Sequence, residues 1–264
     1  MAGSEMDHNA MLLNRKLDAL VEQSGKSLRE LHRLYNRLPA TKCLCRARCC
    51  SMLPGMNGVE AVSALVRLRG MEAEARERVC LRLLEYFFMN PVRICGCPFL
   101  EGGKCIIYQG RFSGCRAYGV WSADYYERIT AADRKARRVF QEQWKRAGVE
   151  LPGEVLDFEL PYCRNVKIVK RKKGGYDRLL RKTASAIDEL SMKSDSAFHA
   201  DFGNIFFSDL SFLAASMIWG SGRAAGMKFR IVKEFTEHGD ETALATLLRQ
   251  TDISPLSGYV ANHA

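Results

Sequence analysis

The chain has 264 residues, of which 47% are hydrophobic and 27% charged, and its formal net charge is +10. This composition is typical of a globular protein and excludes a disordered, collagen-like or low-complexity chain. A chain of this size can bury enough apolar surface to fold without disulfide cross-links, so its ten cysteines need another explanation. The most apolar window, 205–219, is short and contains Asp209, so we expect no membrane span.

Helical periodicity runs through most of the sequence. Apolar residues recur every three to four positions, the spacing of one helix face, in these stretches: 11–38, 57–70, 79–90, 123–146, 179–190 and 194–264. Strand-like alternation occurs only within 155–170. The sequence therefore predicts a mainly α fold in which helices surround an irregular cysteine-rich core, with a second helical region at the C-terminal end.

Two helix starts carry capping signals. Ser27 followed by Glu30 matches the capping-box pattern, and Asn57 followed by Glu60 repeats it with Asn as the cap. Because Gly25 interrupts the first apolar stretch, we expect two helices or one kinked helix there.

Most of the cysteines fall in two irregular segments, 39–57 and 91–122, which have neither helical nor strand periodicity. A later Lys-Gly-Gly break at 173–175 is typical of a flexible boundary. We expect a cysteine-cluster metal-binding domain over residues 1–173. The helical C-terminal region is expected over residues 174–264.

The cysteines form two groups. The first group is Cys43, Cys45, Cys49 and Cys50, and the second is Cys95, Cys97, Cys105 and Cys115. The beginning of the chain shows no secretory signal, so we expect a cytoplasmic protein whose thiols are reduced. Closely packed thiolates repel one another unless a cation compensates their charge. The pattern therefore predicts a metal centre.

The residue types around this centre restrict the choice of metal. All five histidines lie outside both groups, so the ligands are thiolates, which favour zinc, iron-sulfur clusters or copper(I) over magnesium and calcium. The paired C-x2-C knuckles of common zinc sites are absent. A C-x-C pair, a C-C pair and spaced single cysteines favour an iron-sulfur cluster, most simply 4Fe-4S, with zinc as the alternative.

The second cysteine group carries a resemblance to a known family. Its residues read Cys97-Pro98-Phe99-Leu100, then Cys105-Ile106-Ile107-Tyr108, Arg111 and Cys115-Arg116. This closely resembles the CPFL…C-x-IY…RP…CR box of the YkgJ-like cysteine-cluster family of zinc- or iron-chelating proteins. The chain departs from the family in two places: Phe112 replaces the usual proline, and the first group is C-x-C-x3-C-C instead of CxxCxxCC. The resemblance covers roughly residues 40–120.

The resemblance implies metal binding. We predict a metal-binding protein with a thiolate-ligated iron-sulfur cluster in a redox, sensing or structural role. One branch of the family resembles or includes flagellin lysine methylases. A cluster-dependent enzyme, such as an S-adenosylmethionine-dependent protein lysine methylase, is therefore the alternative, although no methyl-donor site is visible in the sequence.

The predicted ligands are more numerous than one cluster needs. They are Cys43, Cys45, Cys49, Cys50, Cys97, Cys105 and Cys115, with Cys43 and Cys45 as alternatives to each other. One zinc ion or one four-iron cluster uses four thiolates, so either two centres form or some of these cysteines only lie nearby. Cys95 and Cys163 are held in reserve, and the helical spacing of Cys80 indicates a core residue.

Three further residues of the second group are candidates for cofactor contact. We expect the ring of Tyr108 to cover the cluster and the guanidinium groups of Arg111 and Arg116 to balance thiolate charge or donate hydrogen bonds to sulfur. A catalytic role for any of the three is the alternative.

The last third of the sequence does not identify the molecule that the protein binds. Residues 164–182 contain nine Lys or Arg and one Asp, which permits phosphate contact, but no nucleic-acid motif accompanies them and a solvated surface is favoured. Residues 206–260, with Gly-Arg-Ala-Ala-Gly at 222–226, resemble the opening of vinyl-reductase-type domains, which are small-molecule-binding modules. Whether the partner is a protein or a small molecule stays open.

Overall fold

The computed structural model describes residues 7–43, 48–169 and 175–258. Within these residues the chain forms thirteen α-helices and two small antiparallel sheets, which confirms the predicted mainly α fold. The first helices are α1 (His8–Gln23), α2 (Gly25–Tyr35), α3 (Gly58–Arg69), α4 (Ala73–Met89), α5 (Ser113–Ala117), α6 (Ala123–Arg146) and α7 (Gly153–Leu156). The later helices are α8 (Asp177–Ser194), α9 (Ser196–Asn204), α10 (Leu210–Trp219), α11 (Ser221–His238), α12 (Thr242–Gln250) and α13 (Ser254–Ser257).

The first apolar stretch folds as two helices that meet at Ser24, which ends α1 and precedes α2. The capping box predicted at Ser27 and Glu30 is wrong, because α2 already begins at Gly25 and the Ser27 hydroxyl donates to the carbonyl of Ser24 at 2.9 Å. Glu30 accepts a hydrogen bond from Arg33 on the helix surface instead. Asn57 does precede α3, but its side chain accepts no capping hydrogen bond there.

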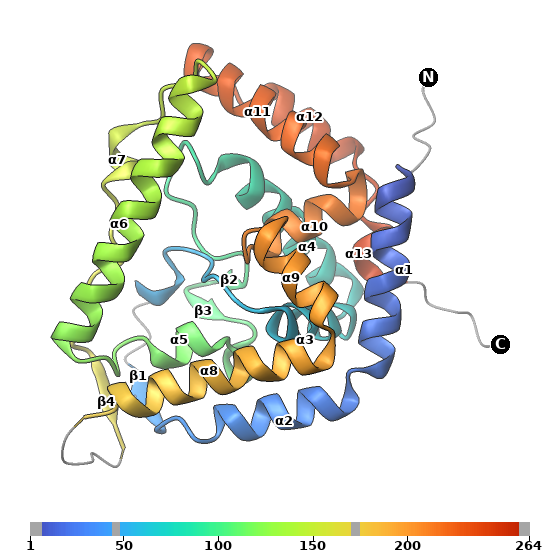
Figure 1. Cartoon of the computed structure of the whole chain (residues 1–264). Coiled ribbons are helices and arrows are strands. Elements are labelled where there is room, and N and C mark those ends of the chain that lie inside the picture. The colour runs from blue at the N-terminus through green and yellow to red at the C-terminus, as the bar shows by residue number, and fades with distance from the viewer. Residues whose placement is uncertain (1–6, 44–47, 170–174, 259–264) are drawn as a thin grey trace.

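Helix α10 lies at the centre of the core (Figure 1). Eight of its ten residues are buried, so it is apolar on all sides, as expected for a helix enclosed by others. It packs against α1, α4 and α11, and Asp209 caps its first turn by accepting from the backbone N–H of Ser211 at 2.8 Å. Apolar residues of α3, α4, α9 and α10 join in one core cluster.

Helices on both sides of residue 173 share this core. Helix α8 lies beside α2 (Figure 1) and packs on α2 and α3, while α9 packs on α3 and α8. The division into regions 1–173 and 174–264 stays a prediction, and residues 173 and 174 lie outside the described residues.

Two short strand pairs fix the cysteine-bearing loops. Strand β1 (Thr41–Cys43) pairs antiparallel with β4 (Val166–Ile168), with Cys43 opposite Val166. Strand β2 (Leu100–Glu101) pairs with β3 (Lys104–Cys105), and Gly102 and Gly103 make the turn between them with φ values of 55° and 75° that favour glycine. Of the strand expected within 155–170, only Val166–Ile168 is confirmed as a strand among the described residues, whereas Gly153–Leu156 form the short helix α7.

Helix α6 is the longest helix of the described chain and forms one edge of the molecule (Figure 1). Its extent confirms the helix predicted over 123–146. Only Thr130 of α6 is fully buried, so the apolar face seen in the sequence is not enclosed as a core face.

Among the described helices, none combines the length and the apolar character needed to cross a membrane.

Replacing a fully buried residue of α10 should destabilise the whole fold. Leu213 has no exposed surface, so we expect Leu213→Ala to lower the free energy of unfolding by about 2 to 5 kcal/mol through lost burial and a residual cavity. Urea unfolding followed by circular dichroism measures the change. The matched control is Leu12→Ala on α1, where the side chain is 50% exposed and the expected loss is below about 0.5 kcal/mol. Equal losses would contradict the central position of α10.

Candidate metal centre

Five cysteines from the two predicted groups line a single cavity of about 250 Å³. They are Cys49, Cys50, Cys97, Cys105 and Cys115. They come from four local structures: the 3-10 turn η1 (Arg48–Cys50) carries Cys49 and Cys50, and the others lie in the loop before β2, in strand β3 and in helix α5. The cavity therefore brings together residues that the helical hairpin α3–α4 separates in the sequence.

Backbone hydrogen bonds hold these segments side by side. The N–H of Cys97 donates to the carbonyl of Cys50 at 2.7 Å, which joins the two cysteine groups directly. The N–H of Leu100 donates to the carbonyl of Cys97 at 2.9 Å, and Leu100 faces Cys105 across the β2–β3 turn. The rings of Phe99 and Phe112 meet edge to face at 5.9 Å and line the same cavity. One part of the cavity wall is thus formed by cysteine sulfurs and another part by apolar side chains.

The thiols of the cavity resist ionisation with one exception. Burial raises the pKa of Cys97 to about 12 and also raises the pKa of Cys105 and Cys115. The Sγ atoms of Cys49 and Cys50 lie 3.8 Å apart. Their hydrogen bond lowers the pKa of Cys49 to about 7, assisted by the guanidinium of Arg111, and raises that of Cys50.

The donor set has the chemistry of a soft metal site, but its side chains are not grouped tightly. All five candidate ligands are sulfur, which is the donor type of zinc and iron-sulfur sites. Metal binding would replace the thiol protons, because the ligand is the thiolate. Across the described ranges, no three His, Cys, Asp or Glu side chains are grouped so that they could hold a metal ion directly.

The remaining cysteines either lie away from the cysteine cavity or fall outside the part of the chain that the structure describes. The backbone of Cys43 ends β1, its side chain lies outside the described structure, and Cys45 lies outside the described residues. Cys80 is fully buried in α4 within the core. Cys95 lines a separate cavity with Arg93, and Cys163 is buried but does not line the cysteine cavity.

Two of the three predicted cofactor-contacting residues border the cysteine cavity. Tyr108 and Arg111 both line it, with the Arg111 guanidinium 4.4 Å from the centre of the Tyr108 ring. Arg116 does not line the cavity, because its guanidinium lies 4.6 Å from the centre of the Tyr35 ring and donates to the carbonyl of Arg111 at 2.9 Å. Arg111 therefore lines the cavity beside the sulfurs, as does Lys104, whereas Arg116 does not.

A buried carboxylate, Glu60, supports α5, the helix that carries Cys115. The sequence pattern indicated this residue only as part of a helix start. Glu60 of α3 is 1% exposed. It accepts from the Tyr35 hydroxyl at 2.6 Å, from the Ser113 N–H at 2.7 Å and from the Ser113 hydroxyl at 3.1 Å. It thereby ties α2 and α3 to α5, which carries Cys115. The cap pattern was the only signal of Glu60, and it did not indicate burial.

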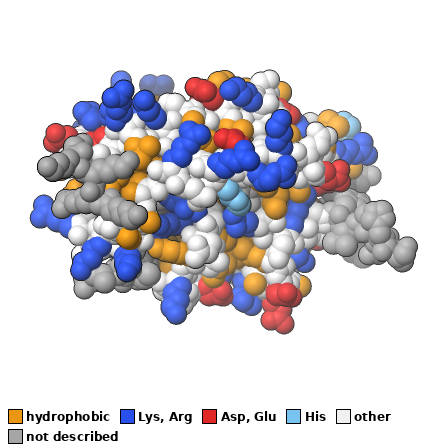
Figure 2. Space-filling view, turned by 90° about the horizontal axis from the view of Figure 1, so that it is seen from below, with side chains coloured by type: hydrophobic (Ala, Val, Ile, Leu, Met, Phe, Trp, Pro, Cys, Tyr) orange, Lys and Arg blue, Asp and Glu red, His pale blue; other side chains and the backbone are white. Residues whose placement is uncertain are grey.

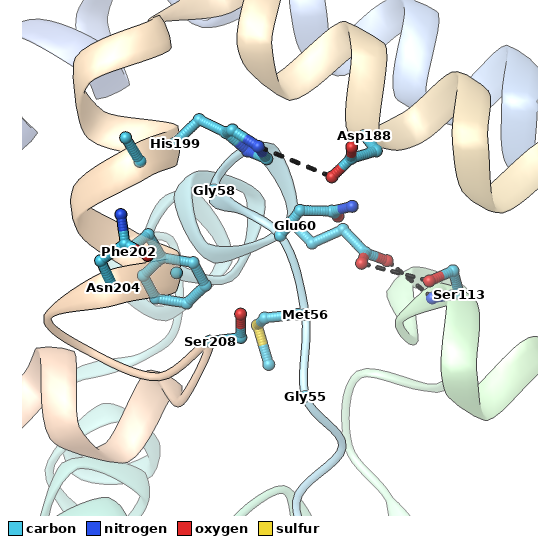
Figure 3. A pocket seen from close by; sticks show the side chains of 13 residues that line it. Gly55, Met56, Gly58, Glu60, Ser113, Asp188, His199, Phe202, Asn204 and Ser208 are labelled. Atoms are coloured by element: carbon cyan, nitrogen blue, oxygen red, sulfur yellow. Dashed lines mark hydrogen bonds and ion pairs between the residues drawn. The ribbon is translucent and has the colours of Figure 1, made fainter. Parts of the chain in front are cut away.

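Glu60 also borders a second, polar cavity of about 650 Å³ (Figure 3). Ser113 lines this cavity, whereas Cys115, two residues along α5, lines the cysteine cavity. In Figure 3 the ring of His199 points toward Asp188, and their nearest atoms are 3.6 Å apart. The cavity is large enough for a small molecule, and α5 contributes lining residues to both cavities.

The basic stretch 164–182 is described only in part, because 170–174 lie outside the described residues. In the described part, the guanidinium of Arg181 lies 5.8 Å from the centre of the Tyr125 ring. On the face shown in Figure 2, Lys and Arg side chains are spread over the surface with Asp and Glu among them. Nucleic-acid contact through 164–182 stays a prediction.

No match to this chain was found among protein-family models, curated proteins or solved structures. The resemblance of the second cysteine group to the YkgJ-like family therefore depends on the residues quoted above. The same holds for the resemblance of 206–260 to vinyl-reductase-type domains. Both resemblances stay predictions.

Glu60 should make stability depend on pH. Burial raises its pKa above the usual value of 4.5, so the folded state holds the proton more tightly than the unfolded state. The resulting stabilisation is complete below pH 4.5 and is lost as pH rises through the raised pKa. Glu60→Gln stays neutral. Its amide oxygen can accept from the Tyr35 hydroxyl and the Ser113 N–H, while its NH2 can donate to the Ser113 hydroxyl, so its free energy of unfolding relative to wild type should increase as pH rises.

Urea unfolding at pH 4, 6 and 8 measures this difference. Glu60→Ala leaves the half-buried Ser113 N–H and the buried Tyr35 hydroxyl without their acceptor and should lose about 2 kcal/mol or more throughout. Glu30→Gln, which removes a surface pair with Arg33, is the matched control and should show little change. A constant difference between wild type and Glu60→Gln across the three pH values would contradict the assignment.

Proposed function

We propose that this chain is a metal-binding protein that carries a thiolate-ligated iron-sulfur cluster, with a 4Fe-4S cluster as the simplest form. The observation that supports the proposal is the convergence of five cysteine side chains on one cavity. Soft sulfur donors without histidine are the ligand set of such clusters. Zinc is the alternative metal, because four thiolates also satisfy its tetrahedral coordination.

One four-iron cluster needs four thiolates, so one of the five cavity cysteines would be left over. Cys50 is the best candidate for that residue, because its thiol is the hydrogen-bond partner that lowers the pKa of Cys49. Cys49, Cys97, Cys105 and Cys115 would then be the ligands. Hydrogen bonds to ligand sulfur are a recognised means of tuning a metal centre.

The other cavity residues support charge balance and exclusion of water. Arg111 contributes a positive charge beside the sulfurs and donates to the Thr41 hydroxyl at 3.1 Å, which fixes its position. Phe99 and Phe112 are almost fully buried and provide an apolar wall. Charge and access of water to the sulfurs both set the reduction potential of a cluster. These features fit a redox or sensing role as well as a structural one.

Anaerobic purification followed by iron, zinc and acid-labile sulfide analysis tests the proposal. We expect iron and sulfide in equal amounts and a brown protein whose visible absorption bleaches with reductant. A colourless protein with stoichiometric zinc and no iron would overturn the cluster and support the zinc alternative. A protein that binds neither metal would overturn both.

Single cysteine variants test which residues hold the metal. Cys97→Ser and Cys115→Ser should lower metal content and destabilise the protein, since metal-binding energy is partly folding energy. The matched control is Cys80→Ala, which removes a buried thiol of α4 outside the cavity and should keep full metal content. Full occupancy in both serine variants would show that the ligands lie elsewhere.

A cluster-dependent enzyme that uses S-adenosylmethionine is the second candidate. The polar cavity that α5 also lines supports it, because it is of small-molecule size and lies next to the cysteine-bearing helix (Figure 3). Anaerobic calorimetric titration of the metal-loaded protein with S-adenosylmethionine tests this candidate. Saturable binding that is weakened by Gly203→Leu, at a residue that lines the cavity and whose added side chain would meet no packed neighbour, would support it. Absence of binding would contradict it.

A further inference from the structure

The apolar face of helix α6 borders a cavity instead of a packed neighbour. Ala132, Ala136, Val139 and Phe140 line a cavity of about 910 Å³, whose other walls come from α4, α10 and α11. Val139 and Phe140 remain 54% and 39% exposed. Exposed apolar side chains that gather around a cavity are typical of a binding site.

Aromatic rings contribute to all sides of the cavity. Phe87 stacks on Phe212 with ring centres 5.2 Å apart, and Trp144 of α6 stacks on Phe229 at 5.8 Å. Phe207 extends the wall and is 74% exposed. Its φ of 52° is rare for a side chain of this size, so the fold maintains an unfavourable backbone conformation at this rim. An apolar ligand in this cavity would cover these rings.

One cation projects into the aromatic cavity. Lys228 of α11 lines it, with Nζ 4.5 Å from the centre of the Phe87 ring and 2.9 Å from Asn90 Oδ1. Within the described part of the chain, the ammonium group donates to Asn90 Oδ1 and has three donors in all. Burial lowers the pKa of Lys228 to about 8, although the negative charge of Asp209 acts in the opposite direction.

Among the described residues that line the cavity, Asp209 is the acidic one. Its charge favours the charged form of Lys228, but its Oδ1 already accepts from the N–H and the hydroxyl of Ser211 at the first turn of α10. The positive end of the α10 helix dipole further balances its charge. Lys135 and Arg137 of α6 also line the cavity, so positive charge is in excess there.

We propose that this cavity binds a small hydrophobic carboxylate, whose apolar body contacts the aromatic walls and whose carboxylate accepts hydrogen bonds from Lys228 Nζ. A neutral apolar ligand would cover the ammonium group without compensating it, which is unfavourable. A carboxylate compensates it with a charge-assisted hydrogen bond. The cavity volume is within the range of about 300 to 1,000 Å³ of small-molecule sites. This proposal is independent of the metal centre.

Calorimetric titration of the full chain with decanoate and with decanol tests the proposal. The two probes share an apolar chain and differ in charge. We expect decanoate to bind at least about tenfold more tightly than decanol, in line with one charge-assisted hydrogen bond. Lys228→Met should remove this preference while leaving decanol binding unchanged. The matched control is Lys233→Met on the same helix, where Lys233 pairs with Glu237 at the surface, and it should keep the preference.

A second variant locates the binding site. Ala136→Trp places a large side chain in the α6 wall of the cavity and should weaken binding of both probes about tenfold or more, with the thermal unfolding midpoint as a check on folding. Equal affinity for decanoate and decanol, or an unchanged preference in Lys228→Met, would overturn the carboxylate. Unchanged affinity in Ala136→Trp would place binding outside this cavity and overturn the site.

Discussion

The carboxylate of Glu60 is the contact on which the arrangement around the cysteine cavity most depends. It is enclosed by protein and bonded to Tyr35 of α2 and to Ser113 of α5. A buried carboxylate is tolerated only where donors surround it, so the three helices must keep the positions that supply those donors. The short helix α5 has five residues and no fully buried side chain of its own. Its position, and with it that of Cys115, therefore depends on Glu60.

The second constraint is the enclosure of α10. Since α10 packs against α1, α4 and α11, it holds in position helices that lead to or line different cavities. Helix α4 leads into the loop of Cys95 and Cys97, and it also supplies Phe87 and Asn90 to the aromatic cavity. Helix α11 supplies Lys228. The cysteine cavity and the aromatic cavity are thus positioned by the same core, although they share no lining residue.

The sequence predicted the positions of the helices more accurately than the contacts between them. The apolar spacing of 123–146 matched α6 closely, because periodicity records which side of a helix is apolar. It could not show that this side would face a cavity, since that depends on how α4, α10 and α11 are placed. Likewise, the grouping of the cysteines in two segments was visible, but the exclusion of Cys95 from the cavity and the turn of Arg116 toward Tyr35 are results of tertiary packing. Glu60 was the largest omission, because a charged residue in a helical pattern normally indicates a solvated position.

The backbone bond between Cys97 and Cys50 carries a consequence for the order of assembly. These residues flank the α3–α4 hairpin, so the bond joins segments that are distant in the sequence. Contacts between distant segments form slowly, because the loop between them must close first. The walls of the cysteine cavity are therefore complete only once this long-range contact has formed, whereas Cys49 and Cys50 are neighbours in the chain from the start.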